Sequence, residues 1–225
     1  MSDAGESESD LPRAKVPTIR RAITTDRREL AETLARAFDD DPVWGWLFPD
    51  PASRERRSAQ VFLAYLRDAM DVGEVYTTPD RSGASLWKPP GKWKLSNGAI
   101  IRSLPALLRA FGTRLPASLE VERKVESQHP TEPHWYLSVV GTDPVAQGKG
   151  IGGALIRQIT DRCDADGLPA YLESSKKTNV PYYERFGFRV TGDTRLGDDG
   201  PTIWFMWRDP QVPDALVPTD RPQPA

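Results

Sequence analysis

The chain has 225 residues, which is enough for one substantial domain with a hydrophobic core of its own. Its 30 basic and 32 acidic residues give a formal net charge of −2, so it has no general attraction to nucleic acid or to an anionic membrane. One cysteine and two histidines exclude an internal disulfide and are too few for a standard zinc site.

The ends of the chain and its hydropathy set the expected boundaries. The sequence contains no run of eighteen apolar residues and no apolar N-terminal segment, so we expect a cytoplasmic protein, monomeric or homodimeric, without a membrane span or signal peptide. Residues 1–15 are acidic and polar, and residues 209–225 are rich in proline. We expect both ends to be disordered and a single domain to cover residues 16–208.

In chain order, residues 16–23 are expected to form a first strand. Asp26 and Glu29 then form a capping pattern ahead of a helix that ends before the acidic run 39–41. Such a run before a proline is more typical of a solvated turn than of a metal site. A second helix is expected over residues 53–72.

Two irregular stretches carry aromatic side chains. Residues 42–49 form an expected loop with Trp44, Trp46 and Phe48, which either provide an aromatic wall for an acceptor substrate or plug the core. Trp93, in the proline-rich stretch after the strands expected at 74–78 and 84–88, is a further candidate for contact with an acceptor. Helical patterns at 97–111 and 115–128 then form an insert that either shapes a substrate pocket or serves as scaffold.

The next segment changes its periodicity at a glycine-rich loop. Residues 136–140 are typical of a buried strand, whereas apolar residues four apart from Ile151 onward are typical of a helix. Glycines at 148, 150, 152 and 153 lie between the two and remove every Cβ that would keep a ligand from the backbone. Because the start of a helix offers unpaired N–H groups and a partial positive charge, this loop predicts a phosphate site.

Three phosphate-binding patterns compete for this loop. A Walker loop is excluded, since six residues separate Gly141 from Gly148 and no Ser or Thr follows Lys149. A dinucleotide fingerprint fits the glycines and an acid at Glu173, but its first glycine would have to follow the strand directly. The third pattern has Gln147, Gly150 and Gly152 in the spacing Q-x-x-G-x-G. By this pattern the sequence resembles the GNAT superfamily of acyl-CoA-dependent N-acetyltransferases.

The resemblance extends through the C-terminal half. Residues 170–173 form an expected strand parallel to 136–140, because a helical crossover of about fourteen residues returns the chain in the same direction. Asn179 and Tyr183, followed by residues 186–188, match a second GNAT motif, and a last strand is expected at 203–208. Within the superfamily, the sequence looks most similar to puromycin N-acetyltransferase and its actinobacterial relatives.

The resemblance implies a fold and a co-substrate. The implied fold is α/β (α+β), a mixed, mostly antiparallel sheet with a splayed parallel strand pair, flanked by helices. The implied co-substrate is acetyl-CoA, with no metal. Its pyrophosphate would be bound by Gln147, Gly148, Lys149, Gly150, Ile151 and Gly152, and its pantetheine arm by Asn179 and by backbone groups near Val140 and Thr142.

The chemistry needs a free amine, a polarised carbonyl and a proton for the departing sulfur. The resemblance assigns the last task to Tyr183, which an ordinary pKa of about 10 keeps protonated at neutral pH. Glu173 and His134 are both candidates for the base. We therefore expect acetyl transfer to an amine of a small molecule in a ternary complex. A protein amine as acceptor, or a non-catalytic acyl-CoA sensor, are the alternatives.

Overall fold

The computed structural model describes residues 16–95 and 97–211, so the expected tails, apart from residues 209–211, lie outside the described residues. Its centre is a seven-stranded sheet in the order β1-β2-β3-β4-β5-β7-β6. The strands are β1 (Arg20–Arg21), β2 (Glu74–Thr77), β3 (Gly83–Lys88), β4 (Trp135–Thr142), β5 (Ala170–Ser174), β6 (Arg189–Arg195) and β7 (Thr202–Arg208). Only β4 and β5 pair in parallel, and the other neighbours pair antiparallel.

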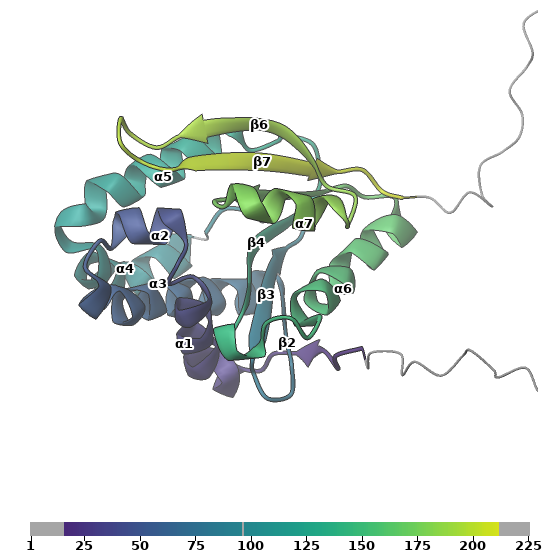
Figure 1. Ribbon diagram of the computed structural model, residues 1–225, viewed down its shortest axis with the longest axis horizontal. Coiled ribbons are helices and arrows are strands. Elements are labelled where there is room, and N and C mark those ends of the chain that lie inside the picture. Colours follow the sequence, from purple (N-terminus) through teal and green to yellow (C-terminus); the bar gives the residue numbers. More distant parts are fainter. Residues whose placement is uncertain (1–15, 96, 212–225) are drawn as a thin grey trace, which may run out of the picture.

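Helices cover both faces of the sheet. A group of N-terminal helices lies on one side of β3 and β4, and α6 lies on the other side, as Figure 1 shows. This group comprises α1 (Arg27–Ala37), α2 (Pro42–Leu47), α3 (Pro51–Val72), α4 (Asn97–Phe111) and α5 (Leu115–Gln128); α6 (Ile151–Asp166) and α7 (Val180–Glu184) follow later in the chain. The mixed, mostly antiparallel sheet flanked by helices is the fold that the sequence predicted.

Strand β4 carries a bulge at Ser138. Leu86 of β3 pairs with Val139 and the next residue, Trp87, pairs with Leu137, so Ser138 is one extra residue on β4. Its hydroxyl donates to the carbonyl of Leu86 at 3.0 Å. Residues before and after the bulge therefore do not alternate regularly. Leu137 packs toward α6, whereas Val139, two residues on, packs toward α1 and α3.

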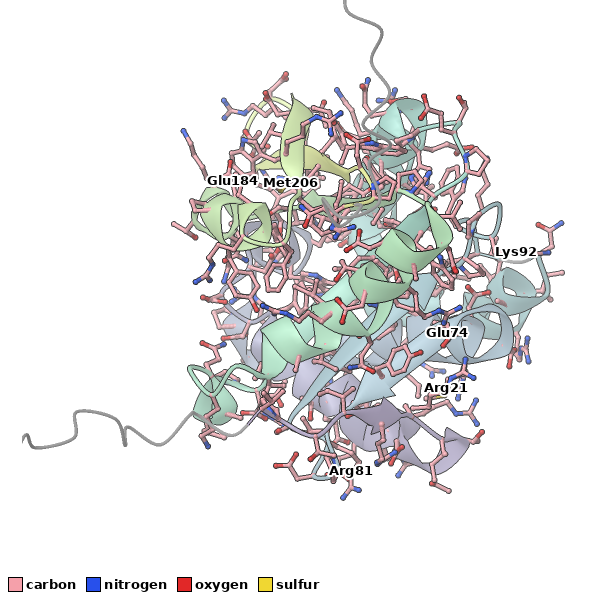
Figure 2. All side chains as sticks on the ribbon, turned by 90° about the vertical axis from the view of Figure 1, so that its right-hand side faces the viewer. Arg21, Glu74, Arg81, Lys92, Glu184 and Met206 are labelled. Atoms are coloured by element: carbon pink, nitrogen blue, oxygen red, sulfur yellow. The ribbon has the colours of Figure 1, made fainter. Side chains whose placement is uncertain are left out.

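Helix α6 crosses its face of the sheet diagonally (Figure 2). Ile156 and Ile159 are fully buried against the sheet. Arg162 lies 3.2 Å from Glu74 of β2 and stacks over the ring of Trp135. Apolar burial and this ion pair together fix the direction in which the N-terminus of α6 points.

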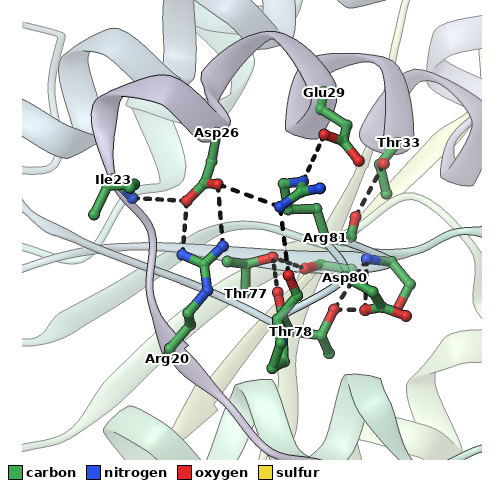
Figure 3. Close-up of polar contacts among 12 residues, drawn as sticks. Arg20, Ile23, Asp26, Glu29, Thr33, Thr77, Thr78, Asp80 and Arg81 are labelled. Atoms are coloured by element: carbon green, nitrogen blue, oxygen red, sulfur yellow. Dashed lines mark hydrogen bonds and ion pairs between the residues drawn. The ribbon is translucent and has the colours of Figure 1, made fainter.

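Helix α1 is attached to the β2–β3 hairpin by the polar contacts in Figure 3. Asp26 accepts two hydrogen bonds from Arg20, at 2.7 and 3.0 Å, and one from the backbone N–H of Ile23. Arg81 of the hairpin donates to Glu29 at 2.5 Å. Asp26 is thus the end of a short 3-10 turn and does not cap α1 with its side chain, contrary to the capping pattern expected there.

Three elements differ from the sequence prediction. The first strand shrinks to Arg20–Arg21. Residues 42–47 form the helix α2 instead of a loop, because Pro42 suits a first helical position and Asp41 accepts from the next two N–H groups. Asp41 is therefore buried, not solvated. Strand β6 was not expected, since its exposed residues show no apolar alternation. The helices expected at 97–111 and 115–128 are confirmed as α4 and α5.

None of the helices in the described part of the chain combines the length and the apolar character that crossing a bilayer requires.

Candidate active site

A groove of about 820 Å³ lies between the end of β4, the start of α6 and α7. The glycine-rich loop forms one of its walls through Gln147, Gly148, Gly150, Ile151 and Gly152. The backbone N–H groups at the start of α6 are the ones that a helix leaves unpaired. A phosphate in this groove would therefore meet main-chain donors and the positive end of the helix dipole.

Glycine is required in this loop for two separate reasons. Gly148 and Gly150 have φ of +78°, the left-handed region that side chains with a Cβ disfavour. At Gly152 a Cβ would lie 2.7 Å from the hydroxyl of Tyr182, so the close packing of α6 on α7 leaves no room for it. The loop is anchored at its other end by Asp143, whose carboxylate accepts from Arg36 of α1 at 2.8 Å.

Three cations stand around the groove. Arg157 lies one and a half turns into α6, Lys176 follows β5 and Arg185 follows α7, and all three line the cavity. Lys176 also forms an ion pair with Asp40, three residues after α1. The groove therefore combines backbone donors with positively charged side chains, which suits a ligand with several phosphates.

Beyond the groove, β4 and β5 separate. They pair from Trp135 with Ala170 to Leu137 with Leu172, and no further. A chamber of about 100 Å³ opens where the pairing stops, between residues 137–140 of β4 and residues 172–175 at the end of β5. Asn179 and Tyr183 line both the chamber and the groove. The splayed parallel pair predicted from the sequence therefore creates a narrow passage from the groove into the sheet.

Tyr183 is held inside this passage. It is 9% exposed, and its ring packs against those of Tyr182 and Phe188. Burial raises its pKa well above the ordinary value, and the nearby Tyr182 and Asp41 add to the shift. Asp41 is fixed by a hydrogen bond from Ser175. Tyr183 therefore keeps its proton at neutral pH and lies where a ligand's end would reach it.

Glu173 also lines the chamber. Its side chain is 11% exposed. Tyr136 and Tyr171 flank it, and burial together with the negative charge of Glu173 raises the pKa of both tyrosines. The wall of the chamber thus contains both a protonated hydroxyl and a carboxyl group.

A third cavity, of about 210 Å³, lies on the α1 side of the sheet. It is mostly apolar and aromatic, and it shares Phe38, Ser138 and Val139 with the chamber. Residues of α2, α3, α4, α5, β3 and β4 line it, with Trp44 and Trp93 among the lining residues. The chamber thus shares wall residues with the groove and with the pocket, and the three are together called the passage.

The comparisons with known proteins fit this arrangement. Residues 125–205 match a family described as "Acetyltransferase (GNAT) domain". An uncharacterized N-acetyltransferase of Schizosaccharomyces pombe is 31% identical over 220 residues, which cover 92% of this chain and 89% of the relative. The chain belongs to the GNAT acetyltransferase family. It is an N-acetyltransferase, and enzymes of this family use acetyl-CoA as co-substrate.

Two further GNAT relatives are informative. A mycothiol acetyltransferase of Brachybacterium faecium is 33% identical over 197 residues, which cover 81% of this chain but 45% of the relative. A crystal structure from Corynebacterium glutamicum, described as histone acetyltransferase HPA2 and related acetyltransferase, superposes with a TM-score of 0.68 at 26% identity. That superposition covers 89% of this chain and 99% of the other.

The structure brings most of the predicted GNAT site residues together. Val140, Thr142, Asn179, Tyr183 and the loop residues all line the groove, except that Lys149 is exposed beside it. Of the predicted acceptor residues, Trp44 and Trp93 line the pocket. Trp46 instead donates to Asp199 and lies under Arg114, and Phe48 is fully buried against Phe111 and Arg57, so neither lines it.

His134 does not reach the chamber of the acetyltransferase. Its Nδ1 donates to the backbone carbonyl of Glu132 at 2.6 Å, and its Nε2 meets Nε2 of His129 at 3.1 Å. His129 stands between His134 and Glu173. Sequence reasoning missed His129, because it follows the end of α5 without any motif. It also missed Asp41 and Ser138, whose positions depend on the cap of α2 and the bulge of β4.

No group of three or more metal-ligating side chains that could hold an ion occurs within residues 16–95 and 97–211.

Proposed function

We propose that residues 16–208 form a single acetyltransferase domain that moves an acetyl group from acetyl-CoA directly to an amine of a small molecule. The observation that carries this proposal is the passage, in which a groove suited to phosphates and an apolar pocket each share wall residues with a chamber lined by Glu173 and Tyr183. Both substrates can meet there in one ternary complex.

The groove fits acetyl-CoA by the chemistry of its walls. The main-chain donors of the loop and the start of α6 suit the pyrophosphate, while Arg157 and Arg185 offer charge to further phosphate oxygens. The passage past Asn179 and Tyr183 suits the pantetheine arm and brings the thioester to the chamber. Backbone groups of β4 beyond Leu137 are not paired with β5 and are the donors available to a developing oxyanion.

Tyr183 is the proposed acid. Burial raises its pKa, so the hydroxyl is protonated at neutral pH and can donate to the sulfur as the thiolate departs beside it. Glu173 is the proposed base, because it lines the chamber and His134 does not. It would take the proton of the acceptor ammonium, directly or through water, and so produce the free amine that attacks the thioester.

The chamber offers no activated nucleophile, which supports direct transfer. The hydroxyls of Ser138 and Ser174 donate to backbone carbonyls, and that of Ser175 donates to Asp41. Cys163 is buried in α6 outside the chamber, and burial raises its pKa to about 12. No covalent acetyl-enzyme intermediate is therefore proposed.

The pocket supports a small acceptor with an apolar body. Its volume of about 210 Å³ is small, and side chains from six elements converge on it. Glu122, an exposed residue in its wall, could attract a cationic group of the acceptor. The similarity to a mycothiol acetyltransferase also supports a small molecule. We keep the narrower likeness to the puromycin N-acetyltransferase group as part of this proposal.

The test is CoA release, followed with a thiol reagent, from acetyl-CoA and a panel of amines. The panel contains arylalkylamines, polyamines, aminoglycosides, puromycin and a lysine peptide. We expect turnover on a small amine, and a loss of about a hundredfold in kcat for Tyr183→Phe with little change in KM for acetyl-CoA. Turnover on the peptide alone would contradict the small-molecule acceptor. Unchanged kcat in Tyr183→Phe would contradict the assigned acid.

A further inference from the structure

The two histidines of the chain form a contact pair behind the proposed base. His129 follows α5 and His134 precedes β4, so two different elements deliver them to one place. Their Nε2 atoms lie 3.1 Å apart. On the far side, Nδ1 of His129 lies 3.7 Å from Oε1 of Glu173. The row Glu173, His129, His134 thus starts in the wall of the chamber.

The hydrogen-bond partners fix the tautomers in this row. A backbone carbonyl can only accept, so His134 carries a proton on Nδ1, which faces the carbonyl of Glu132 at 2.6 Å. Burial lowers the pKa of His134, so the ring is neutral and its Nε2 is an acceptor. His129 must then donate from its own Nε2. A neutral His129 therefore presents the lone pair of Nδ1 to Glu173.

The gap between His129 and Glu173 has room for one proton. Among the described residues, neither Nδ1 of His129 nor Oε1 of Glu173 has a hydrogen-bond partner, and both atoms are buried. At 3.7 Å the two acceptors are too close for a water molecule between them and slightly too far for a hydrogen bond. A proton on either atom would turn this contact between two lone pairs into a bond. The pair is therefore built to take up a proton.

The other end of the row reaches a second opening. His129 and His134 both line a depression of about 530 Å³ formed by residues 90–94 and 126–134. Trp93 separates this depression from the acceptor pocket, since it lines both, and its ring stacks on His129 with centroids 3.7 Å apart. The histidines thus connect the chamber with a cavity that the substrates do not fill.

Other ionisable groups face the row from each neighbouring element. Tyr136 of β4 and Tyr171 of β5 pack edge-on against His129. Glu126 of α5 and Lys94 line the depression and form an ion pair with each other. The further charged groups nearby are Glu122, Glu132 and Lys88.

We propose that His129 and His134 carry the acceptor's proton from Glu173 to solvent in the depression. The inference rests on the proposed function. The ammonium gives a proton to the Glu173 carboxylate, and Glu173 gives it to Nδ1 of His129. The resulting imidazolium gives its Nε2 proton to Nε2 of His134, and His134 returns one proton to water. No electrons are transferred. The proton that leaves His134 is the one on Nδ1, so both rings end as the opposite tautomers, and each exchanges its proton with water or rotates before the next turnover. His129 and His134 are positioning residues that act through Glu173.

The first test reads the tautomers without any turnover. Untagged protein has two histidines, so a long-range imidazole ¹H–¹⁵N spectrum contains two spin systems. We expect one ring, His134, to be neutral with its proton on Nδ1, and the Nδ1 signal of the other ring to move in Glu173→Gln. The proposal would be overturned if neutral His134 carries its proton on Nε2, or if the Nδ1 signal of His129 does not move in Glu173→Gln.

The second test reads the relay in turnover. In His129→Gln we expect kcat to fall about tenfold or more, KM values to stay within about twofold, and the acid limb of the kcat/KM profile to move to lower pH. The reason for the shift is that no imidazole then faces Glu173, so the carboxylate has to hold the acceptor's proton without passing it on.

Chemical rescue separates this role from a structural one. Imidazole in the buffer should restore activity to His129→Ala through the depression, whereas pyrazole, a ring of the same size but a far weaker base, should not. Thr131→Val, a neutral change in the wall of the same depression, should leave the pH profile unchanged. Loss of activity in His129→Gln without a shifted acid limb of the kcat/KM profile, together with no rescue of His129→Ala by imidazole, would contradict the relay. If wild-type protein acetylates no amine, the proposed function fails, and the imidazole spectrum still decides the histidine pair.

Discussion

The two ends of the passage are built in different ways. The groove is formed mainly by one stretch, residues 140–157, and by the short segment 176–186, with glycines and main-chain groups prominent in its wall. The acceptor pocket is formed by side chains from six helices and strands and from the segments beside them, within residues 38–139. A main-chain site leaves a motif with fixed spacing in the sequence, whereas a site made of scattered side chains leaves none.

The difference also bears on specificity. Backbone donors recognise a phosphate whatever the neighbouring side chains are, so the groove suits a co-substrate shared by a whole family. The pocket has no such constant part, and a single substitution in α2, α4 or α5 changes its shape. Substitutions at one end should therefore leave ligand binding at the other end unchanged.

The largest expected effect is at the groove. Gly152→Val places a Cβ within 2.7 Å of the Tyr182 hydroxyl and adds bulk to the wall of the groove. We expect the Kd for acetyl-CoA, measured by calorimetry, to rise about a hundredfold, or about 2.7 kcal/mol. Gly45→Ala is the control, since a Cβ there meets nothing within 4 Å. Equal affinity in both variants would contradict the main-chain site.

A smaller effect is expected at the pocket. Val125→Trp in α5 fills part of a cavity of about 210 Å³, so KM for the amine should rise about tenfold or more while the Kd for acetyl-CoA stays within about twofold. Leu119→Trp is the matched control, because Leu119 lies on the same helix and is 60% exposed. A parallel loss of acetyl-CoA binding in Val125→Trp would show that the two ends are coupled.

The end of α1 lies beside both cavities, with Ala37 in the wall of the groove and Phe38, the next residue, in the wall of the pocket. Arg20 holds the pKa of Asp26 below its usual range, so this carboxylate stabilises the fold above the ordinary pKa of about 3.9 and the stabilisation is lost as pH falls through the lowered value. Asp26→Asn should therefore cost about 2 kcal/mol of unfolding free energy at pH 7, with the difference vanishing once the pH falls below the lowered pKa of Asp26.

Thermal unfolding at several pH values measures this difference. Glu29→Gln is the control, because its side chain is 51% exposed and its ion pair with Arg81 should contribute less than about 1 kcal/mol. If Asp26→Asn is as stable as wild type at neutral pH, the hydrogen bonds of Asp26 in Figure 3 do not stabilise the fold.

The smallest effect is expected at Cys163, which belongs to neither end. Burial raises its pKa to about 12, so a disulfide reagent at pH 8 should label almost none of the native protein and about one thiol per unfolded chain. Rapid labelling of native protein would mean that α6 opens, and with it the wall of the groove.

The sequence predicted the groove in detail because its residues are adjacent in the chain. Gln147, Gly150 and Gly152 occupy the predicted loop, and the separation of β4 from β5 follows the predicted parallel pair. The pocket could not be predicted to the same depth. Trp44 lies on the short helix α2 and Phe48 directly follows it, yet Trp44 lines the pocket and Phe48 is buried in the core, and this depends on the cap that Asp41 gives to α2.

His129 shows the same limit from another side. It lies 44 positions before Glu173 in the chain, and only the folding of α5 against β4 and β5 brings the two together. No periodicity or spacing marks such a contact. Strand β6 was missed for a related reason, since it is an edge strand whose residues are mostly exposed and carry no apolar alternation.

The bulge at Ser138 makes the length of β4 a functional quantity. Because of this one extra residue, Val139 faces the acceptor side and Val140 the groove side. Deletion of a single residue here would reverse both, even if every other amino acid were kept. Substitutions along β4 should thus be tolerated far better than insertions or deletions. In an alignment of relatives, an invariant number of residues between Trp135 and Gly148 would say more about shared catalysis than identity at any one of those positions.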